Sequence, residues 1–250
     1  MNKKSFIKYF YISIFLFVIH SQLFAEKIIF SANSMTGKTG DSSSTTELKG
    51  NSYILTETME ISADEITLSG DDYRFIEATG KVKGKNLETK MEFTADTLNF
   101  DRTTKIAKLI GNVELIDTEN SVKAKAQRIE YNQDKEIAIL QIEVYLTQKE
   151  NECTGAYAIY HKKQQILELS GNAQVKQKRD IFRAQNIYFN MDTEEIKLGG
   201  NVKGSVTDTK ETATKESLKS ETKENKTTDS VESETKENKS TDSVESETKE

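Results

Sequence analysis

The sequence predicts an all-β fold made of tandem bent antiparallel strand pairs. Three observations lead to this prediction. A frame of apolar and small residues recurs about every thirty residues, as expected for a repeat array. Within each unit the apolar residues alternate with a period of two, which is typical of strands. The alternation changes parity at the same place in successive units, which indicates a recurring bend.

The clearest copy of the frame lies between Ile61 and Val82. An apolar residue and a small residue come first, then an alternating apolar pair, and finally a glycine followed two residues later by another apolar residue. The same frame fits residues 93–113 and 182–202. Two weaker copies cover residues 126–144, where Ile142 replaces the glycine, and residues 155–173. A degenerate first copy covers residues 30–50.

The parity change predicts a corner in each unit. Ile61 and Ala63 have odd numbers, whereas Ile66 and Leu68 have even numbers. Neighbouring side chains of a strand point to opposite faces, so one extra residue must redirect the backbone near residues 64 and 65. The same change occurs at residues 95–98, 126–129 and 184–187, and we therefore expect a corner in each of these units.

A polar turn and a second strand complete each unit. The turns are predicted at residues 69–73, 101–105, 132–136, 161–165 and 190–195, which are mostly rich in Asp, Asn and other polar residues. The second strand alternates cleanly, as from Ala107 to Leu115 and from Leu167 to Val175. In the first copy, the polar stretch 36–50 predicts a long loop or a frayed end cap. Five or six units give about twelve strands and a sheet of about 55 to 60 Å.

The apolar positions of both strands share one interior in this arrangement. If the two walls of the bent sheet pack on each other, the interior is a core; if they splay, it is a trough that suits a lipid, and the pattern leaves both alternatives open. The candidate groove residues are Ile61, Ile66, Leu68, Ile76, Val82, Phe93, Leu98, Phe100, Leu109, Val113, Leu115, Ile129, Tyr131, Leu140, Val144, Leu167, Leu169, Val175, Phe182, Ile187, Phe189, Leu198 and Val202.

The two ends of the chain differ from the repeats, which we place at residues 26–204. Residues 1–25 combine early lysines, an apolar run and a small residue before Glu26, as in a cleaved secretory signal peptide. The alternative is an uncleaved anchor, although the apolar run is shorter than the roughly 20 residues that span a bilayer. Residues 205–250 consist almost wholly of Lys, Glu, Thr, Ser, Asp and Asn, which predicts a disordered tail.

Composition and motifs argue against several function classes. With 30% charged residues of both signs and a net charge of −6, the chain has no basic stripe for nucleic acid. Asp64 and Asp96 occupy the same corner position in successive units, so we interpret them as turn residues and predict no catalytic residue. His161 lies in a charged turn without a second ligand at metal spacing, and Cys153 falls in an apolar column. We therefore expect no metal and no cofactor.

The repeated A-D-x-Φ-x-Φ motif (Φ, apolar) at residues 63–68 and 95–100, with G-N-V at 111–113 and 200–202, resembles the OstA-like family, which includes LptA. The resemblance covers residues 26–204. It implies an elongated, open β-jellyroll, or β-taco, that carries lipopolysaccharide acyl chains in its groove. It also implies a head-to-tail homo-oligomer bridging two membranes, with LptC-like and LptD-like partners. The chain departs from the motif at Gln127, Ala156 and Ile142.

Together these observations predict a non-enzymatic periplasmic carrier of lipopolysaccharide or a related glycolipid. One alternative is a membrane-anchored docking subunit of the same pathway, which would retain residues 1–25. Another is a structural or adhesive repeat protein with a dry core. An enzyme of the β-solenoid type has the least support, because no cluster of acids stands outside the repeat.

Overall fold

The computed structural model describes residues 27–38 and 45–207 of the 250-residue chain. The predicted signal peptide and nearly all of the predicted tail lie outside these residues. Within them the fold is all-β, as predicted, with one short 3₁₀ turn, η1 (Asp71–Tyr73). The strands are β1 (Ile29–Ser31), β2 (Ser34–Lys38), β3 (Thr45–Leu55), β4 (Met59–Ser69), β5 (Phe75–Asn86), β6 (Met91–Asp101), β7 (Ile106–Asp117), β8 (Val122–Asn132), β9 (Ile137–Gln148), β10 (Asn151–His161), β11 (Ile166–Gln177), β12 (Asp180–Asn190), β13 (Ile196–Gly199) and β14 (Lys203–Ser205).

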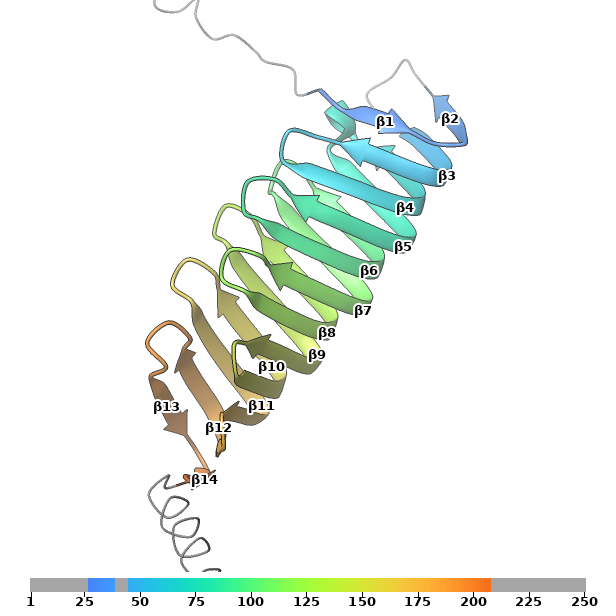
Figure 1. Ribbon diagram of the computed structural model, residues 1–250. Helices are drawn as coiled ribbons and strands as arrows, with labels where there is room; N and C mark the ends of the chain where they lie inside the picture. The colour runs from blue at the N-terminus through green and yellow to red at the C-terminus, as the bar shows by residue number, and fades with distance from the viewer. Residues whose placement is uncertain (1–26, 39–44, 208–250) are drawn as a thin grey trace, which may run out of the picture. The chain divides into compact units, whose positions relative to one another are not determined.

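These strands form one antiparallel sheet that is not closed. From β3 to β12 each strand pairs with its sequence neighbours, while β1 and β2 both pair with β3, and β13 and β14 both pair with β12. Every long strand is bent, so the sheet folds back on itself as two layers (Figure 1). Wall A contains residues 52–55, 59–63, 82–86, 91–95, 113–117, 122–126, 144–148, 151–155, 173–177 and 180–184. Wall B contains residues 45–49, 65–69, 75–79, 97–101, 106–110, 128–132, 137–141, 157–161, 166–170 and 186–190.

The bends lie where the parity of the sequence changes. In the pairing of β4 with β5, the register shifts between Ser62 and Glu65, which confirms the predicted corner. The partner strand contributes the other half of the bend. Gly80 (φ 77°) and Lys81 (φ 50°) are consecutive left-handed residues, and the same pair of conformations recurs at 50/51, 111/112, 142/143, 171/172 and 200/201. Each corner is thus built from two strands.

The glycine of the corner also makes room for the acidic residue across from it. A Cβ atom at Gly80 would lie 2.6 Å from Oδ2 of Asp64, and one at Gly111 would lie 2.2 Å from Oδ2 of Asp96. A side chain is therefore excluded there by both backbone conformation and space. Oδ1 of Asp64 lies 3.6 Å from Nζ of Lys81, so both residues of this ion pair belong to the corner.

The terminal strands are bent strands divided in two. β1 pairs with the wall A half of β3 and β2 pairs with its wall B half, so residues 29–38 make one bent strand with its corner at residues 32–33. β13 and β14 make the matching last strand, with its corner at residues 200–201. The prediction of a loop at residues 36–50 was wrong for the most part. β2 extends to Lys38 and β3 begins at Thr45, because backbone pairing with β3 and β4 outweighs the polar composition.

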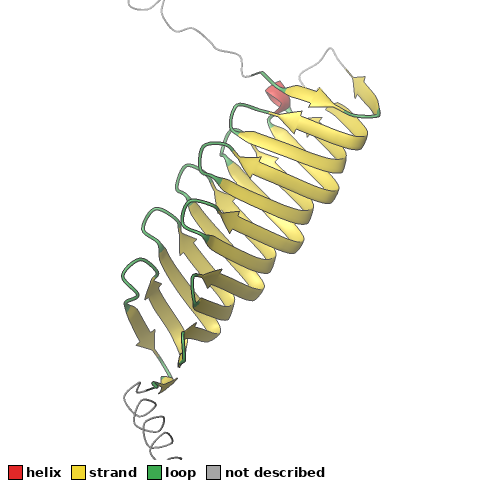
Figure 2. Ribbon diagram, viewed as in Figure 1, coloured by secondary structure: helices red, strands yellow, loops and turns green. Residues whose placement is uncertain are grey.

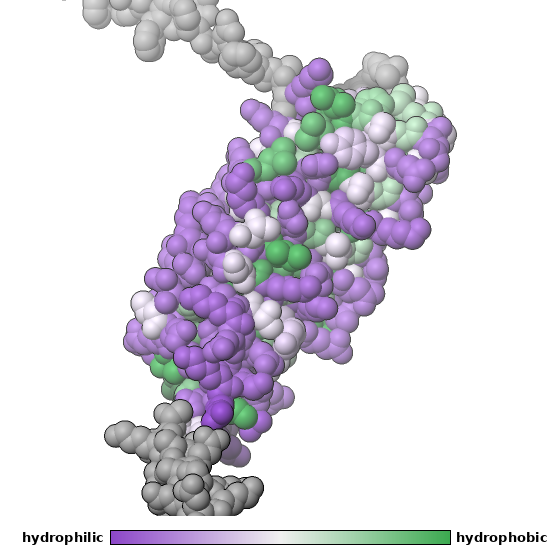
Figure 3. Space-filling view, viewed as in Figure 1, coloured by the Kyte–Doolittle hydropathy of each residue, from purple (hydrophilic) through white to green (hydrophobic). Residues whose placement is uncertain are grey.

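The alternation of side chains divides the sheet into an apolar inside and a polar outside. One continuous cluster of buried residues runs from Leu48 to Met191 between the walls. The outer face is largely hydrophilic in the view of Figure 3, with apolar patches mainly near the N-terminal end. The corners lie along one side of the folded sheet and the turns along the other (Figure 2). This arrangement is an elongated, open β-jellyroll.

Candidate ligand-binding seam

The seam is the apolar interior between wall A and wall B. The structure brings the predicted groove residues together there, because all except Phe182, Leu198 and Val202 are buried. Phe93 is the most exposed of the buried ones, at 6%. The two walls therefore pack against each other along the seam.

Sequence reasoning missed several residues of the same interior. They are Leu48, Ile54, Met59, Met91, Ala124 and Leu146, all at most 2% exposed. Their signal was present in the alternation of each strand, since Met59 and Met91 stand two residues before Ile61 and Phe93. Cys153 is also fully buried, and burial raises the pKa of its thiol to about 12, which confirms its interpretation as an interior residue.

The seam is open at both ends. At the N-terminal end Phe30 pairs with Ile54 and Met35 pairs with Leu48, so both point inward, yet they remain 45% and 56% exposed. At the other end Val202 is 55% exposed, and Phe182 and Leu198 are half-buried. Within the described residues no further strand covers these side chains. The apolar interior therefore reaches solvent at its two mouths.

The turns form two lips along the free edges of the walls. Lip A consists of residues 56–58, 87–90, 118–121, 149–150 and 178–179, and lip B of residues 70–74, 102–105, 133–136, 162–165 and 191–195. Within a lip, successive turns are joined by backbone hydrogen bonds, such as Gln133 N–H to the Lys105 carbonyl (3.0 Å) and Lys162 N–H to the Glu136 carbonyl (3.0 Å).

A polar cluster, which we call the latch, joins lip A to lip B near the middle of the seam. Lys162 Nζ lies 3.3 Å from Oδ1 of Asp117 and also contacts Glu119, and the Lys162 and Asp117 side chains are 2% and 0% exposed. Tyr160 donates its hydroxyl proton to Oδ2 of Asp117 at 2.7 Å. Asn120 donates to the same oxygen at 2.8 Å and to the Lys162 carbonyl at 3.2 Å. A buried charged pair is thus surrounded by hydrogen bonds on both lips.

The electrostatics of the latch follow from its burial. Burial by itself lowers the pKa of Lys162, but the carboxylates of Glu119 and Asp117 more than offset this effect, so the net shift of its pKa is upward. Burial and the adjacent Asp117 carboxylate both raise the pKa of Tyr160. Lys162 therefore stays charged and Tyr160 stays protonated at neutral pH.

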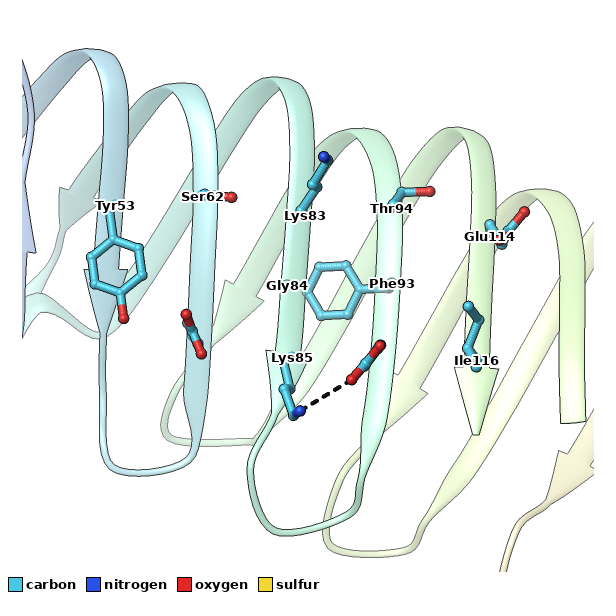
Figure 4. A pocket seen from close by; sticks show the side chains of 11 residues that line it. Tyr53, Ser62, Lys83, Gly84, Lys85, Phe93, Thr94, Glu114 and Ile116 are labelled. Atoms are coloured by element: carbon cyan, nitrogen blue, oxygen red, sulfur yellow. Dashed lines mark ion pairs between the residues drawn. The ribbon is translucent and has the colours of Figure 1, made fainter. Parts of the chain in front are cut away.

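A separate pocket of about 320 Å³ lies on the outer face of wall A (Figure 4). Outward side chains of β3 to β7, including Tyr53 and Ile116, line it, and Lys85 pairs with Glu92 at 3.1 Å. At its floor the ring of Phe93 lies over Gly84, where a Cβ atom would be 2.1 Å from Cζ. The glycine thus creates the space that this ring fills.

In the part of the chain that the structure describes, the side chains considered for catalysis or metal binding lie apart from one another. Asp64 and Asp96 lie at separate corners, and Nε2 of His161 lies 3.0 Å from Oε1 of Glu168 at the surface. In residues 27–38 and 45–207 no three His, Cys, Asp or Glu side chains are grouped as a metal site. No helix in the same residues is long and apolar enough to cross a membrane.

Comparison with known proteins supplies the family. The family model described as LptA/(LptD N-terminal domain) LPS transport protein matches residues 31–137, 116–166 and 141–195. A similar solved structure is that of LptH, the LptA homologous periplasmic component of the conserved lipopolysaccharide transport device from Pseudomonas aeruginosa. It is 18% identical, with a TM-score of 0.45, over 48% of this chain and 97% of that chain. No curated protein matches. Since the family model covers most of the repeat array, the chain belongs to the LptA/LptD N-terminal family of lipopolysaccharide transport proteins.

Proposed function

We propose that this protein carries lipopolysaccharide or a related glycolipid through the periplasm, with the acyl chains held in the seam. The observation that carries the proposal is the continuous apolar interior that reaches solvent at both mouths. Phe30 and Met35 at one end are inward-facing yet about half exposed, and Val202 at the other end is 55% exposed. A dry core with no ligand gains nothing from exposing such residues, whereas a track for acyl chains requires open ends.

An acyl chain would enter by separating the packed walls. Each methylene group taken from water into an apolar site contributes about 0.8 kcal/mol. The inserted chain replaces wall-to-wall contacts with chain-to-wall contacts, so the apolar side chains stay covered. Opening the walls therefore costs free energy mainly because polar groups of the lips lose their hydrogen-bond and ionic partners.

Photocrosslinking tests the proposal. A photoreactive amino acid at Phe100, Leu115 or Phe189, all at most 2% exposed, is expected to capture purified lipopolysaccharide in a saturable manner. The matched controls place the same probe at the adjacent outward positions, Asn99 and Tyr188, which are expected to give little capture. Absence of saturable capture from all three inward probes would refute the carrier function.

Assembly into a head-to-tail bridge is the second part of the proposal, and the end strands support it. Residues 29–38 run from wall A to wall B, whereas residues 196–205 run from wall B to wall A. Placed side by side in two copies, they are antiparallel, and the alternation of the two corner types continues across the junction. Both strands have one unpaired edge among the described residues, and such edges favour strand addition.

Sedimentation velocity tests this assembly. Val202→Asp places a charge at the exposed C-terminal mouth and is expected to reduce concentration-dependent association. Lys197→Glu, which changes the charge on the outer face of neighbouring β13, serves as the control. Equal association of both variants and the unmodified protein would argue against end-to-end stacking. The same exposed ends are the surfaces on which we expect LptC-like and LptD-like partners.

The packed walls favour a second candidate, a structural or adhesive repeat protein with a dry core. This function predicts no lipid in natively extracted protein, which mass spectrometry can determine. The same measurement reports the amino terminus of the mature chain. An intact terminus beginning at Met1 would instead select the membrane-anchored docking subunit.

A further inference from the structure

The two lips repeat one polar arrangement at two successive levels of the seam. Asn86 is the last residue of β5, as Asp117 is of β7, and each is 1% exposed. Both use a side-chain oxygen to accept two backbone N–H groups of the following turn, at 3.0 and 2.7 Å for Asn86 and 3.0 and 3.2 Å for Asp117. Across the seam, Tyr131 and Gln133 take the positions that Tyr160 and Lys162 take in the latch.

The two levels differ in whether their polar groups are satisfied. In the latch, Tyr160 and Lys162 both reach Asp117. At the preceding level, Nδ2 of Asn86, Oγ1 of Thr89, Oη of Tyr131 and both amide atoms of Gln133 are buried without a hydrogen-bond partner. We call these four residues the unpaired level. Their side chains come from both sides of the seam, since Asn86 and Thr89 belong to the wall A side and Tyr131 and Gln133 to the wall B side.

The unpaired level spans the seam as the latch does. Burial raises the pKa of Tyr131, and the Thr89 hydroxyl offsets part of this rise, so Thr89 and Tyr131 lie close to each other across the seam. Gln133 and Tyr131 are each 3% exposed and Thr89 is 8% exposed. Buried polar groups without partners oppose folding, so native proteins retain few of them. Several at one level, from both sides of a candidate binding seam, indicate groups whose partners come from outside the chain.

Building on the proposed function, we propose that the unpaired level binds the hydroxyl-bearing head group of an acylated ligand whose chains lie in the seam. The chemistry of the four side chains sets the class of ligand. Amide and hydroxyl groups are neutral and both donate and accept, which suits sugar hydroxyl and amide groups. The buried cation of the neighbouring level, Lys162, is already engaged by Asp117 and Glu119.

The latch sets one boundary of this site. At the unpaired level, the five buried polar atoms have no hydrogen bonds that would be lost when the lips separate. At the latch, separation breaks a buried ion pair and its hydrogen bonds. The lips therefore part first at the unpaired level, and the latch keeps the adjacent section of the seam closed. A head group is held on the N-terminal side of the latch.

Isosteric apolar variants test the inference. Gln133→Met and Thr89→Val, combined in one protein, remove buried polar atoms that lack partners, so the midpoint of urea unfolding is expected to rise. Binding of purified lipopolysaccharide is expected to weaken about tenfold or more, because hydrogen bonds to the head group are lost. Binding of a fluorescent fatty acid, which has no sugar, reports on the seam alone. The matched control is Lys162→Met, the same change at the equivalent latch position, which is expected to lower the unfolding midpoint.

A gain-of-contact variant provides the second arm. Asn86→Asp with Gln133→Lys copies the charged pair of the latch into the unpaired level, beside the existing Glu88, and is expected to join the two sides of the seam there and exclude lipopolysaccharide. Unchanged lipopolysaccharide binding in both variants, with fatty acid bound normally, would overturn this inference and leave the carrier function standing. If the unmodified protein binds neither probe, the carrier function and this inference both fail.

Discussion

Replacing Ile142 with glycine is expected to stabilise the protein, although it removes a large apolar side chain. Ile142 occupies the corner position that glycine holds at residues 50, 80, 111, 171 and 200, and its φ is 67°. The left-handed conformation costs an L-residue about 1–2 kcal/mol, and it is especially unfavourable for a β-branched side chain. Ile142 is 60% exposed, so little packing is lost on its removal. The greater freedom of glycine in the unfolded chain offsets roughly 0.5–1 kcal/mol of this gain.

The net effect of Ile142→Gly is a gain of about 1 kcal/mol in the free energy of unfolding, or about 2–4 °C in Tm for a domain of this size. Urea denaturation followed by circular dichroism measures it. Ile142→Ala is the matched control, because it keeps the Cβ atom and with it most of the strain. A variant Ile142→Gly that is no more stable than Ile142→Ala would refute the assignment of strain to this corner.

Three further predictions concern the latch, a surface pair and the outer pocket. Lys162→Met leaves buried carboxylate charge uncompensated and is expected to lower the free energy of unfolding by about 3 kcal/mol in urea titrations; a loss under 1 kcal/mol would contradict the buried pair. The Arg74 guanidinium donates two hydrogen bonds to the Asp101 carboxylate, at 2.7 and 2.9 Å, and holds the pKa of that carboxyl well below its usual range. The contribution of this pair to the free energy of unfolding is therefore complete above the unfolded pKa of about 3.9 and is lost as the pH falls toward the lower folded pKa. Unfolding midpoints measured from pH 6 to pH 2 should therefore converge for the unmodified protein and Arg74→Met, and a constant difference would exclude this linkage. Gly84→Ala places a Cβ atom 2.1 Å from the Phe93 ring and is expected to destabilise by about 1–3 kcal/mol, with Phe93→Leu restoring part of the loss; additive losses in the double variant would show that the two residues do not conflict.

The corners show how far the sequence alone could lead. The parity change at residues 61–68 located the bend correctly, because side-chain alternation is a strict property of a strand. The role of the glycine column remained hidden, since a glycine recurring with apolar neighbours fits many kinds of bend. The φ angles show that the partner strand forms half of each corner, with two left-handed residues in succession. Recurrent Gly-Asn and Gly-Lys dipeptides were the available signal.

The lips show where sequence reasoning stopped. Asp117 lies more than forty residues before Tyr160 and Lys162 in the sequence, with a separation of 43 for the hydrogen-bonded pair Tyr160–Asp117, and it belongs to a different unit of the repeat. Nothing in a repeat frame indicates which turn of one lip faces which turn of the other. That correspondence depends on how the two walls pack against each other. The unpaired level was equally invisible, because amide and hydroxyl residues in turns are ordinarily solvated.

The sequence by itself determined the strand content, the repeat, the corners and the identity of many of the interior residues. The strands, corners and interior positions are encoded locally, in the alternation and composition of each unit, and the repeat follows because that pattern recurs along the chain. The tertiary structure decided that the walls touch, that the interior reaches solvent at both mouths, and that one level of the lips is latched while its neighbour is unpaired. Those properties depend on contacts between units that are far apart in the sequence, and a short-range periodic pattern does not specify such contacts.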